Sequence, residues 1–303
     1  MNAWKKALVK YFDRHFTGEY VIDEPLSLHT WYRIGGPADF LVYPRDPKDL
    51  IALLRQCQTL EVERYFIGEG ANVLVSDAGY RGVIINLTRY FTGISRKENI
   101  VTVSAGVLLQ DLVLFSETNS LGGVAYLSGI PGTIGGALMM NAGTNQGEIG
   151  DTVSEVYLLN DAFEPVVVPR EHVTFNYRSV PQLQEKPLLG CQLQLYHEEE
   201  ALLREIRLTQ LAQRAAKQPL DYPSCGSVFK RPTGYYVGKM VEELGLKGFR
   251  YGGAMISKKH GGFIVNLGNA TADHVRYLIE KIQGDVYQHF GIRLEPEVKL
   301  VGF

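Results

Sequence analysis

Two glycine-dense segments carry the clearest chemical signal in this sequence. The first, "GEGAN", spans residues 68–72 and follows an apolar run, and the second, "GIPGTIGG", spans residues 129–136. Glycine adopts left-handed dihedral angles and lets backbone N–H groups approach an anion closely, so consecutive N–H groups can bind a pyrophosphate without a lysine. The apolar surroundings suit a flat aromatic cofactor. The pair therefore predicts a site for a ligand that combines a pyrophosphate with an aromatic ring.

The first segment does not fit the nucleotide-binding motif G-x-G-x-x-G. Val73 occupies the position of the third glycine, and the following "VLVSD" is typical of a strand. That motif needs a strand, a turn and a helix in succession, so we do not expect a Rossmann fold. Taken alone, the first segment is better interpreted as a plain turn, and only the second segment strengthens the ligand-binding hypothesis.

The second segment lies within a window that has no charged residue, from Thr118 to Gly147. The window is long enough to cross a membrane. It contains Pro131, eight glycines and three asparagines, however, and their polar groups would lack partners in lipid. We therefore expect no membrane insertion and interpret residues 128–143 as a buried, glycine-rich ligand loop.

The composition narrows the class of protein. A chain of 303 residues predicts two or three domains, and a formal net charge of -2 without a lysine-rich run argues against a nucleic-acid partner. Three widely separated cysteines indicate neither a disulfide framework nor a zinc site, so no bound metal is expected. The charged N-terminal segment lacks the apolar core of a secretory signal, which predicts a cytoplasmic protein.

Both helices and strands are predicted to position these segments. Apolar periodicity and capping signals predict helices over 3–16, 46–58, 108–120, 198–217 and 270–290. Alternation and turn residues predict strands within 29–44, 64–87, 99–107, 152–160, 163–169, 185–198 and 292–302. In the last strand, apolar residues Ile292, Leu294, Val298 and Leu300 are expected on one face, with Glu295 and Glu297 on the other.

Beyond these local patterns, the order of the motifs is similar to that of one enzyme family. "WYRIGGPADFLVYP", "IGEGANVLVSDAGYRGVIINL", "VSAGV" and "LSGIPGTIGGALMMNAG" resemble the FAD-binding region of the UDP-N-acetylenolpyruvoylglucosamine reductases, flavoenzymes of bacterial peptidoglycan synthesis. The resemblance continues through "FNYRSV", "KQPLDYPSCGSVFKRP", "SKKHGGFIVN" and "FGIRLEPEVKLVG", and so covers the chain from about residue 28 onward. The short chain and the "PSCGSVF" form are similar to the shorter of the family's two types (type II).

The resemblance implies an α+β fold with a two-lobed FAD-binding region of the PCMH type, related to vanillyl-alcohol oxidase. A smaller α+β substrate-binding domain follows it. We expect the two lobes over 1–90 and 91–204 and the substrate-binding domain over 205–303. The family motifs assign FAD contacts to Arg33, Gly68, Glu69, Gly70, Ala71, Asn72, Val73, Ser104, Gly106, Gly129, Ile130, Pro131, Gly132, Gly135, Gly136, Asn141, Ala142 and Gly143.

Three residues depart from the family pattern. Glu69 and Ala71 stand where the family usually has a glycine and a serine, and Ala125 stands where an acidic residue is expected. Backbone N–H groups do most of the phosphate binding in such loops. We therefore expect these changes to alter details of FAD contact and not the assignment.

The reaction that the resemblance implies has two halves. NADPH reduces FAD, and the reduced flavin then transfers hydride to the double bond of UDP-N-acetylglucosamine enolpyruvate, which gives UDP-N-acetylmuramate for the cell wall. Negative charge develops beside a carboxylate, so the site needs electrostatic stabilisation and a proton donor. Matching motifs assign the proton to Ser227 in "CGSVF", and further catalytic roles to Glu297 in "LEPEV" and Arg178 in "NYRS". Substrate contacts are assigned to Tyr177, Lys217, Lys230 and Arg231.

Several assignments depend on the resemblance alone. Spacing does not separate Glu297 from Glu295, and it does not decide whether the Glu297 carboxyl is protonated. Lys258 and Lys259 are further candidates for the phosphates of the substrate or of NADPH. His260 is expected to be structural, and Cys225 is expected to have a packing role.

Two alternative functions stay open. The first is an oxidase of the vanillyl-alcohol-oxidase type, against which the combination of Ser227, Arg178 and Glu297 argues. The second is a non-catalytic UDP-sugar or nucleotide-binding protein, which a colourless purified protein would favour. The expected partners are small molecules, and a monomer is the expected state.

Overall fold

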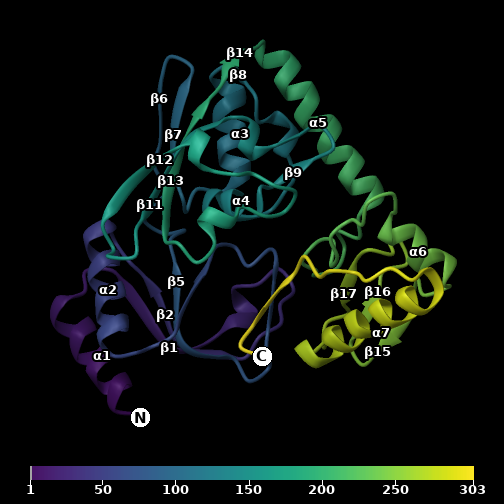
Figure 1. Ribbon diagram of the computed structural model, residues 1–303, viewed down its shortest axis with the longest axis horizontal. Helices are drawn as coiled ribbons and strands as arrows, with labels where there is room; N and C mark the ends of the chain where they lie inside the picture. The colour runs from purple at the N-terminus through teal and green to yellow at the C-terminus, as the bar shows by residue number, and fades with distance from the viewer. Residues whose placement is uncertain (1) are drawn as a thin grey trace. The chain divides into compact units, whose positions relative to one another are not determined.

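The computed structural model describes residues 2–303 as two compact units (Figure 1). Unit 1 comprises 2–22, Asp39–Gly68 and Gly82–Leu211, and unit 2 comprises Asp23–Ala38, Glu69–Arg81 and Ala212–Phe303. Two early segments of the chain therefore fold with its C-terminal third. The three-part division at residues 90 and 204 stays a prediction of the sequence.

A four-stranded sheet and two helices form one part of unit 1. The strands lie in the order β1 (Glu19–Pro25), β2 (Pro37–Tyr43), β5 (Tyr80–Asn86) and β3 (Arg64–Ile67), and the helices are α1 (Ala3–His15) and α2 (Pro47–Thr59). The ring of Phe12 in α1 lies 5.6 Å from that of Phe40 in β2. Asp46 caps α2 by accepting the N–H of Asp49 at 2.8 Å, and Pro47 opens the helix. These contacts confirm the helices predicted over 3–16 and 46–58.

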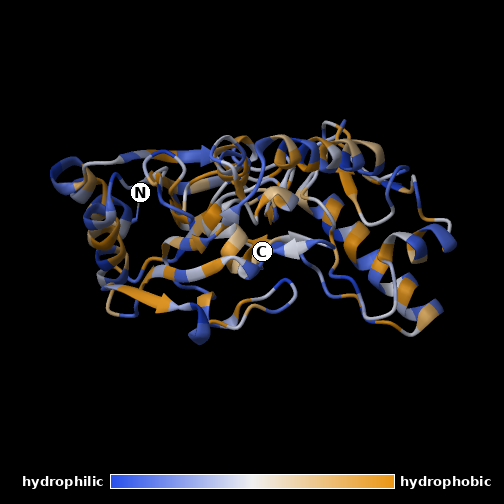
Figure 2. Ribbon diagram, turned by 90° about the horizontal axis from the view of Figure 1, so that it is seen from above, coloured by the Kyte–Doolittle hydropathy of each residue, from blue (hydrophilic) through white to orange (hydrophobic). Residues whose placement is uncertain are grey.

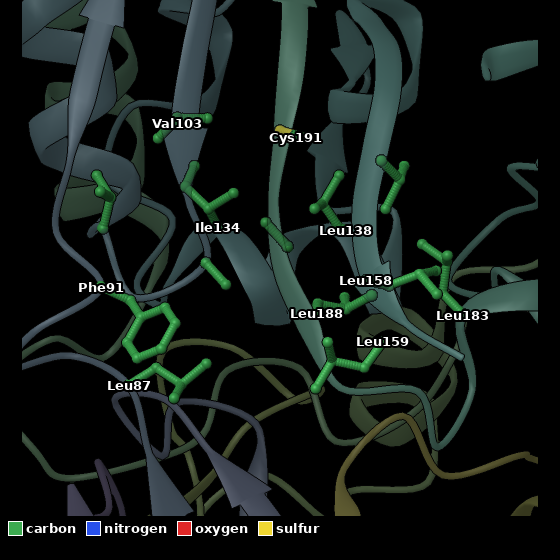
Figure 3. Packing of buried hydrophobic residues seen from close by; sticks show 14 of the residues in the cluster. Leu87, Phe91, Val103, Ile134, Leu138, Leu158, Leu159, Leu183, Leu188 and Cys191 are labelled. Atoms are coloured by element: carbon green, nitrogen blue, oxygen red, sulfur yellow. The ribbon is translucent and has the colours of Figure 1, made fainter. Parts of the chain in front are cut away.

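An antiparallel sheet forms the other part of unit 1. Its strands lie in the order β12 (Pro165–Pro169), β11 (Val153–Leu159), β13 (Leu188–Gln194), β7 (Ile100–Ser104) and β6 (Ile94–Lys97). The helices here are α3 (Leu109–Thr118) and α4 (Ile134–Met140). Ile134 and Leu138 of α4 face Val103, Cys191 and Leu158 of the strands in the core of this unit (Figure 3). The hairpin predicted from "TVSEVYLLN" and "FEPVVVP" is confirmed as β11 and β12.

Short elements complete unit 1. They are the pairs β8 (Leu121–Gly122) with β14 (Tyr196–His197) and β9 (Gly143–Thr144) with β10 (Gly147–Glu148), and the 3-10 helices η2 (Ala125–Leu127), η3 (Ile149–Asp151), η4 (Arg170–His172) and η5 (Pro181–Leu183). Helix α5 (Glu200–Lys217) begins in unit 1 and ends in unit 2. It confirms the long helix predicted over 198–217.

Unit 2 has its own hydrophobic core. Helix α7 (Ala272–Phe290) packs against β15 (Arg250–Tyr251), β16 (Ala254–Ile256) and α6 (Val237–Glu243), and β17 (Ile264–Asn266) pairs with β16. The early segments contribute η1 (Leu26–Leu28) and β4 (Val73–Val75), and β4 pairs in parallel with β18 (Lys299–Val301). Tyr32, Ile34 and Leu74 from these early segments are buried with the residues of α7.

The apolar residues of α7 are buried, as their periodicity predicts. Its buried side chains, Val275, Leu278, Ile279, Ile282 and Val286, recur at helical spacing, and Gly291 ends the helix with a φ of 70°. Figure 2 shows hydrophobic and hydrophilic residues alternating along the helices in the same way. The helix predicted over 270–290 is therefore confirmed.

Two predictions about local structure are wrong in part. The loop expected over 128–143 becomes helix α4 at Ile134, because Thr133 caps it and Ile134, Ala137 and Leu138 have helical spacing. The strand expected over 292–302 is regular only in β18, because Pro296 has no N–H with which to continue a ladder. Leu300, expected in the core, is 48% exposed.

Asp77 should stabilise unit 2 by capping α7. Its carboxylate accepts the N–H of Ala272 at 2.9 Å and that of Asp273 at 3.3 Å, at the positive end of the helix dipole. We expect Asp77→Ala to lower the free energy of unfolding by roughly 1–2 kcal/mol, measured by urea denaturation. The control is Asp161→Ala, whose side chain is 92% exposed and should cost at most about 0.5 kcal/mol. Equal effects of the two variants would contradict this role.

Candidate functional site

The structure divides the predicted site residues between the two units. Unit 1 holds Gly68, Ser104, Gly106, Gly129, Ile130, Pro131, Gly132, Gly135, Gly136, Asn141, Ala142, Gly143, Tyr177 and Arg178. Unit 2 holds Arg33, Glu69, Gly70, Ala71, Asn72, Val73, Lys217, Ser227, Lys230, Arg231 and Glu297. Each half is described by itself.

The two glycine segments meet in unit 1 at Gly68 and Thr133. A Cβ on Gly68 would stand 2.5 Å from Oγ1 of Thr133, which is too close for any side chain. The carbonyl of Gly68 accepts the Nδ2–H of Asn86 at 3.1 Å. Close packing between the segments therefore requires glycine at residue 68. Sequence reasoning missed Thr133, although a threonine three residues before Gly136 is a typical helix-capping signal.

The second segment leaves open space beside the Cα of Gly132. Gly129 and Gly132 have positive φ values of 74° and 126°, and no atom lies within 4 Å of the position that a Cβ on Gly132 would take. A flat or bulky group can therefore approach the backbone there. The N–H groups of Ile134 and Gly135 already donate to Val107 and Ala105 carbonyls at 2.9 and 2.8 Å.

At residue 106, glycine is required for close packing of the backbone. A Cβ there would stand 2.1 Å from the carbonyl oxygen of Leu87, and its N–H donates to the carbonyl of Phe91 at 3.0 Å. The residue lets the turn after β7 pack closely against residues 87–91. This packing accounts for the glycine of "VSAGV" without a ligand.

Arg178 is held by the backbone that follows α4. Its guanidinium donates to the carbonyls of Asn141 and Gly143 at 3.2 and 2.9 Å, and Arg178 itself has a φ of 54°. Its guanidinium carbon lies 5.1 Å from the ring centre of Tyr177, which is 50% exposed. The structure thus brings together three groups that were predicted separately: the arginine, the tyrosine and the "NAG" turn.

Asn141 organises this part of the site. It is fully buried and left-handed, with a φ of 44°, at the end of α4. Its Nδ2 donates to the carboxylate of Glu148 and to the carbonyl of Asn176 at 3.2 Å, and its Oδ1 accepts the N–H of Gly150 at 3.1 Å. The amide group of Asn141 therefore acts both as donor and as acceptor, and these bonds fix the segment that carries Arg178. Sequence reasoning missed Glu148, which nothing in its local pattern singles out.

In unit 2 the first glycine segment lies against residues 29–33. Gly70 has a φ of 65°, and a Cβ on it would stand 2.2 Å from the carbonyl oxygen of His29. Its carbonyl accepts the N–H of Trp31 at 3.1 Å. Arg33 follows with a φ of 53°. The turn is therefore a tightly packed one, as its sequence suggested.

Asn72 joins this segment to the C-terminal strand. Its Nδ2 donates to the carbonyl of Glu297 at 3.1 Å, and its own carbonyl accepts the N–H of Lys299 at 3.0 Å. The N–H of Glu297 donates to the carbonyl of Val228 at 2.7 Å. Ser227 and Glu297 therefore lie on neighbouring, hydrogen-bonded segments. Both side chains are partly exposed, as groups that meet a substrate must be.

Glu295 and the nearby cations have partners of their own. Lys230 forms an ion pair with Glu295, whose side chain is 68% exposed. Arg231 stacks on Tyr236, with its guanidinium carbon 3.8 Å from the ring centre, and Lys259 donates to the carbonyl of Ala215 at 2.6 Å. Lys217, at the end of α5, is exposed. The surroundings of Glu295 thus differ from those of Glu297, which the sequence pattern did not separate.

Metal and membrane sites are absent from the part of the chain that the structure describes. No group of three or more His, Cys, Asp or Glu side chains within residues 2–303 could hold a metal ion. None of the helices in that range combines the length and the apolar character that crossing a bilayer requires.

Known families and proteins match both units. The family described as "FAD binding domain" matches residues 38–162, and "UDP-N-acetylenolpyruvoylglucosamine reductase, C-terminal domain" matches residues 218–301. The UDP-N-acetylenolpyruvoylglucosamine reductase of Alkaliphilus oremlandii is 41% identical, over 98% of this chain and 97% of that protein. That of Caldanaerobacter subterraneus is 40% identical, over 94% of each chain.

Two solved structures are similar to this chain, one of them a reductase of the same name. The UDP-N-acetylenolpyruvylglucosamine reductase of Thermus caldophilus superposes with a TM-score of 0.80 and 31% identity, covering 94% of this chain and 98% of that one. An alkyldihydroxyacetonephosphate synthase covers 63% of this chain and 40% of its own length, with a TM-score of 0.50 and 14% identity. The second likeness shows the fold alone.

The fold, the glycine segments and the matches to known families together define an FAD-binding oxidoreductase. It has a PCMH-type α+β flavin region and a smaller α+β C-terminal domain. The chain belongs to the family of UDP-N-acetylenolpyruvoylglucosamine reductases. This membership confirms the resemblance and the fold that were inferred from the motifs.

Gly132 should be essential for FAD retention. A valine there would adopt a φ of 126°, which L-residues avoid, and would fill the open space beside the backbone. We expect Gly132→Val to purify with little flavin, measured as the ratio of flavin to protein absorbance. Gly284→Ala is the control, because Gly284 is an exposed helical residue whose added Cβ would meet nothing. A folded Gly132→Val protein with full flavin content would remove this segment from the FAD site.

The three cysteines should be unreactive in the folded protein. All are free and buried, and burial raises the pKa of Cys57 and of Cys225 to about 12 and raises that of Cys191. The reactive thiolate is therefore scarce at neutral pH. We expect Ellman's reagent to titrate no thiol in minutes before denaturation and all three after it. Rapid titration of a thiol in the native protein would contradict the packing role of Cys225.

Proposed function

We propose that the chain catalyses the NADPH-driven reduction of UDP-N-acetylglucosamine enolpyruvate to UDP-N-acetylmuramate in peptidoglycan synthesis. Relatives that match nearly its whole length carry the name of this reductase. The observation that carries the proposal is the juxtaposition of Ser227 and Glu297, which a hydrogen bond from Glu297 N–H to the Val228 carbonyl holds on adjacent segments. A hydroxyl and a carboxyl group so placed suit proton transfer to a substrate that develops negative charge.

FAD, when bound, supplies the two-electron chemistry that connects the nicotinamide to the enolpyruvyl double bond. The backbone around Gly132 fits such a group, because the Cβ position of Gly132 is open and its positive φ favours close approach. Gly129, Ile130, Pro131 and Gly132 are the residues that would hold it there.

Ser227 is the proposed proton donor. When hydride adds to one carbon of the double bond, the electron pair moves to the carbon that bears the carboxylate. The Oγ–H bond of Ser227 then breaks as the new C–H bond forms, and the serine regains a proton from solvent. A serine hydroxyl is a poor acid in water but can protonate a strongly basic carbon in a preorganised site. Gly226, with a φ of 81° and open space at its Cβ position, leaves room beside Ser227.

Arg178 and Glu297 are proposed to act on the substrate carboxylate. The guanidinium of Arg178 would stabilise the charge that develops there. It is preorganised by the carbonyls of Asn141 and Gly143, so little rotamer entropy is lost when the substrate binds. Glu297 would hydrogen-bond the carboxylate or polarise the double bond, and its main chain is fixed on both sides by Asn72 and Val228.

The diphosphate and sugar are assigned to groups that remain accessible. Lys217 is exposed, Arg231 is exposed beside Tyr236, and Tyr177 is half exposed. Lys230 is a weaker candidate, because binding a phosphate would break its ion pair with Glu295. We place the reaction in the cytoplasm, a reducing compartment in which the three free thiols persist, with a monomer as the catalytic unit.

An anaerobic absorbance experiment tests the whole proposal. The flavin band of the purified protein is recorded, NADPH is added, and UDP-N-acetylglucosamine enolpyruvate follows. We expect bleaching by NADPH and recovery with the enolpyruvyl substrate. Bleaching without recovery would assign another acceptor, and rapid reoxidation by oxygen with turnover of an alcohol would favour an oxidase. A protein that cannot be loaded with FAD would overturn the proposal.

Ser227→Ala should separate the two half-reactions. We expect reduction of the flavin by NADPH to stay within about twofold of the wild type, and reoxidation by the enolpyruvyl substrate to slow by a factor of about 100 or more, because the proton donor is missing. Stopped-flow absorbance measures both steps. The control is Ser95→Ala, an exposed serine in β6 of unit 1. Equal slowing of both half-reactions would show that Ser227 is structural.

A further inference from the structure

Gly262 contacts the Ser227 segment through its Cα and its carbonyl. Its carbonyl accepts the N–H of Val228 at 2.9 Å, which anchors the residue after the serine. A Cβ on Gly262 would stand 3.1 Å from Oγ of Ser227 and 3.1 Å from Cε1 of His260. The hydrogen on the Cα of this glycine therefore faces the serine hydroxyl and the imidazole together.

His260 completes this arrangement. Its Nδ1 accepts the N–H of Gly262 at 3.1 Å, so the proton of the neutral imidazole is on Nε2. Burial, with a further contribution from Lys247, lowers the pKa of His260 and keeps the ring neutral. The ring packs edge-on against Phe263 with 4.9 Å between centroids, and the backbone N–H of His260 donates to Oγ of the buried Ser257 at 3.3 Å. Both the ring and the main chain of His260 are thus held in place.

We propose that Gly262 and His260 are positioning residues that hold the Ser227 hydroxyl for proton transfer, which rests on the function proposed above. Gly262 leaves just enough room for the serine rotamer, and His260 fixes Gly262 through its N–H. Neither residue exchanges a proton with the substrate in this scheme.

The need for glycine at residue 262 comes from this contact and not from the backbone. Gly262 does not have a positive φ, so alanine could adopt its backbone conformation. The atoms that a Cβ would crowd are the Ser227 hydroxyl and the His260 ring. Gly261 is different, because a Cβ there would stand 2.7 Å from the carbonyl oxygen of Gly238. Gly262→Ala is therefore a specific perturbation, whereas a change of Gly261 would disturb packing.

The first test measures the half-reactions of Gly262→Ala in the FAD-loaded, full-length protein. We expect the enolpyruvyl substrate to reoxidise the flavin at least about tenfold more slowly, because small displacements of a reacting group are costly. Reduction by NADPH should stay within about twofold. Gly284→Ala serves again as the matched control, because its added methyl group meets nothing. Normal reoxidation by Gly262→Ala would overturn the inference.

A double variant separates positioning from general damage. In a Ser227→Ala background the hydroxyl that Gly262 positions is gone, so Gly262→Ala should change the residual reoxidation rate by less than about twofold. The same loss in both backgrounds would show that Gly262 acts through something other than Ser227 and would overturn the proposal.

Substitution of His260 tests the second residue. His260→Ala removes the acceptor for the Gly262 N–H and should slow reoxidation about tenfold. His260→Asn places an amide oxygen near the position of Nδ1 and should restore most of that loss. Failure of the asparagine to rescue would overturn the role of His260. If the wild-type protein itself does not reoxidise with the enolpyruvyl substrate, the proposed function fails and this inference fails with it.

Discussion

The hydrogen bonds of Asn72 to Glu297 and Lys299 are the constraint on which the arrangement of unit 2 depends. They connect positions 225 residues apart in the sequence and continue as the parallel pairing of β4 with β18. Closing so long a loop has an entropic cost, which burial of Leu74 and Val298 in the core helps to offset. The pairing gives the early segment a core to join and fixes the main chain of Glu297. The first glycine segment and the main chain of Glu297 are thus held together by hydrogen bonds.

The glycines that drew attention in the sequence have two distinct physical roles. Gly68 and Gly106 allow close packing, because a Cβ on either would overlap a neighbouring atom of the protein. Gly132 and Gly226 have positive φ and open space where a side chain would be. Only the second kind has open space beside its Cα. A motif that counts glycines treats both kinds alike.

In unit 1 the buried residue Asn141 positions the segment that carries Arg178, the arginine proposed to act on the substrate. Asn141 adopts a left-handed conformation that is costly for a residue with a Cβ, and the hydrogen bonds to Glu148, Asn176 and Gly150 offset that cost. Its hydrogen bond to the Asn176 carbonyl fixes the main chain two residues before Arg178. A guanidinium held by carbonyls in advance binds an anion without first being ordered. Asn141 therefore acts as a support for chemistry that it does not perform.

By itself the sequence determined the elements whose signals are local, such as α2 with its Asp46 cap and α7 with its apolar stripe and terminal glycine. It also determined the family, because eight motifs occur in order along the chain. It did not reveal α4, where glycines obscured a helical spacing, nor the end of the last strand at Pro296. Only the tertiary structure decided that residues 69–81 belong with the C-terminal third, that Glu297 and Glu295 have different neighbours, and that Gly262 faces Ser227. These depend on contacts between residues far apart in the sequence, and such contacts leave no mark on the local pattern of residue types.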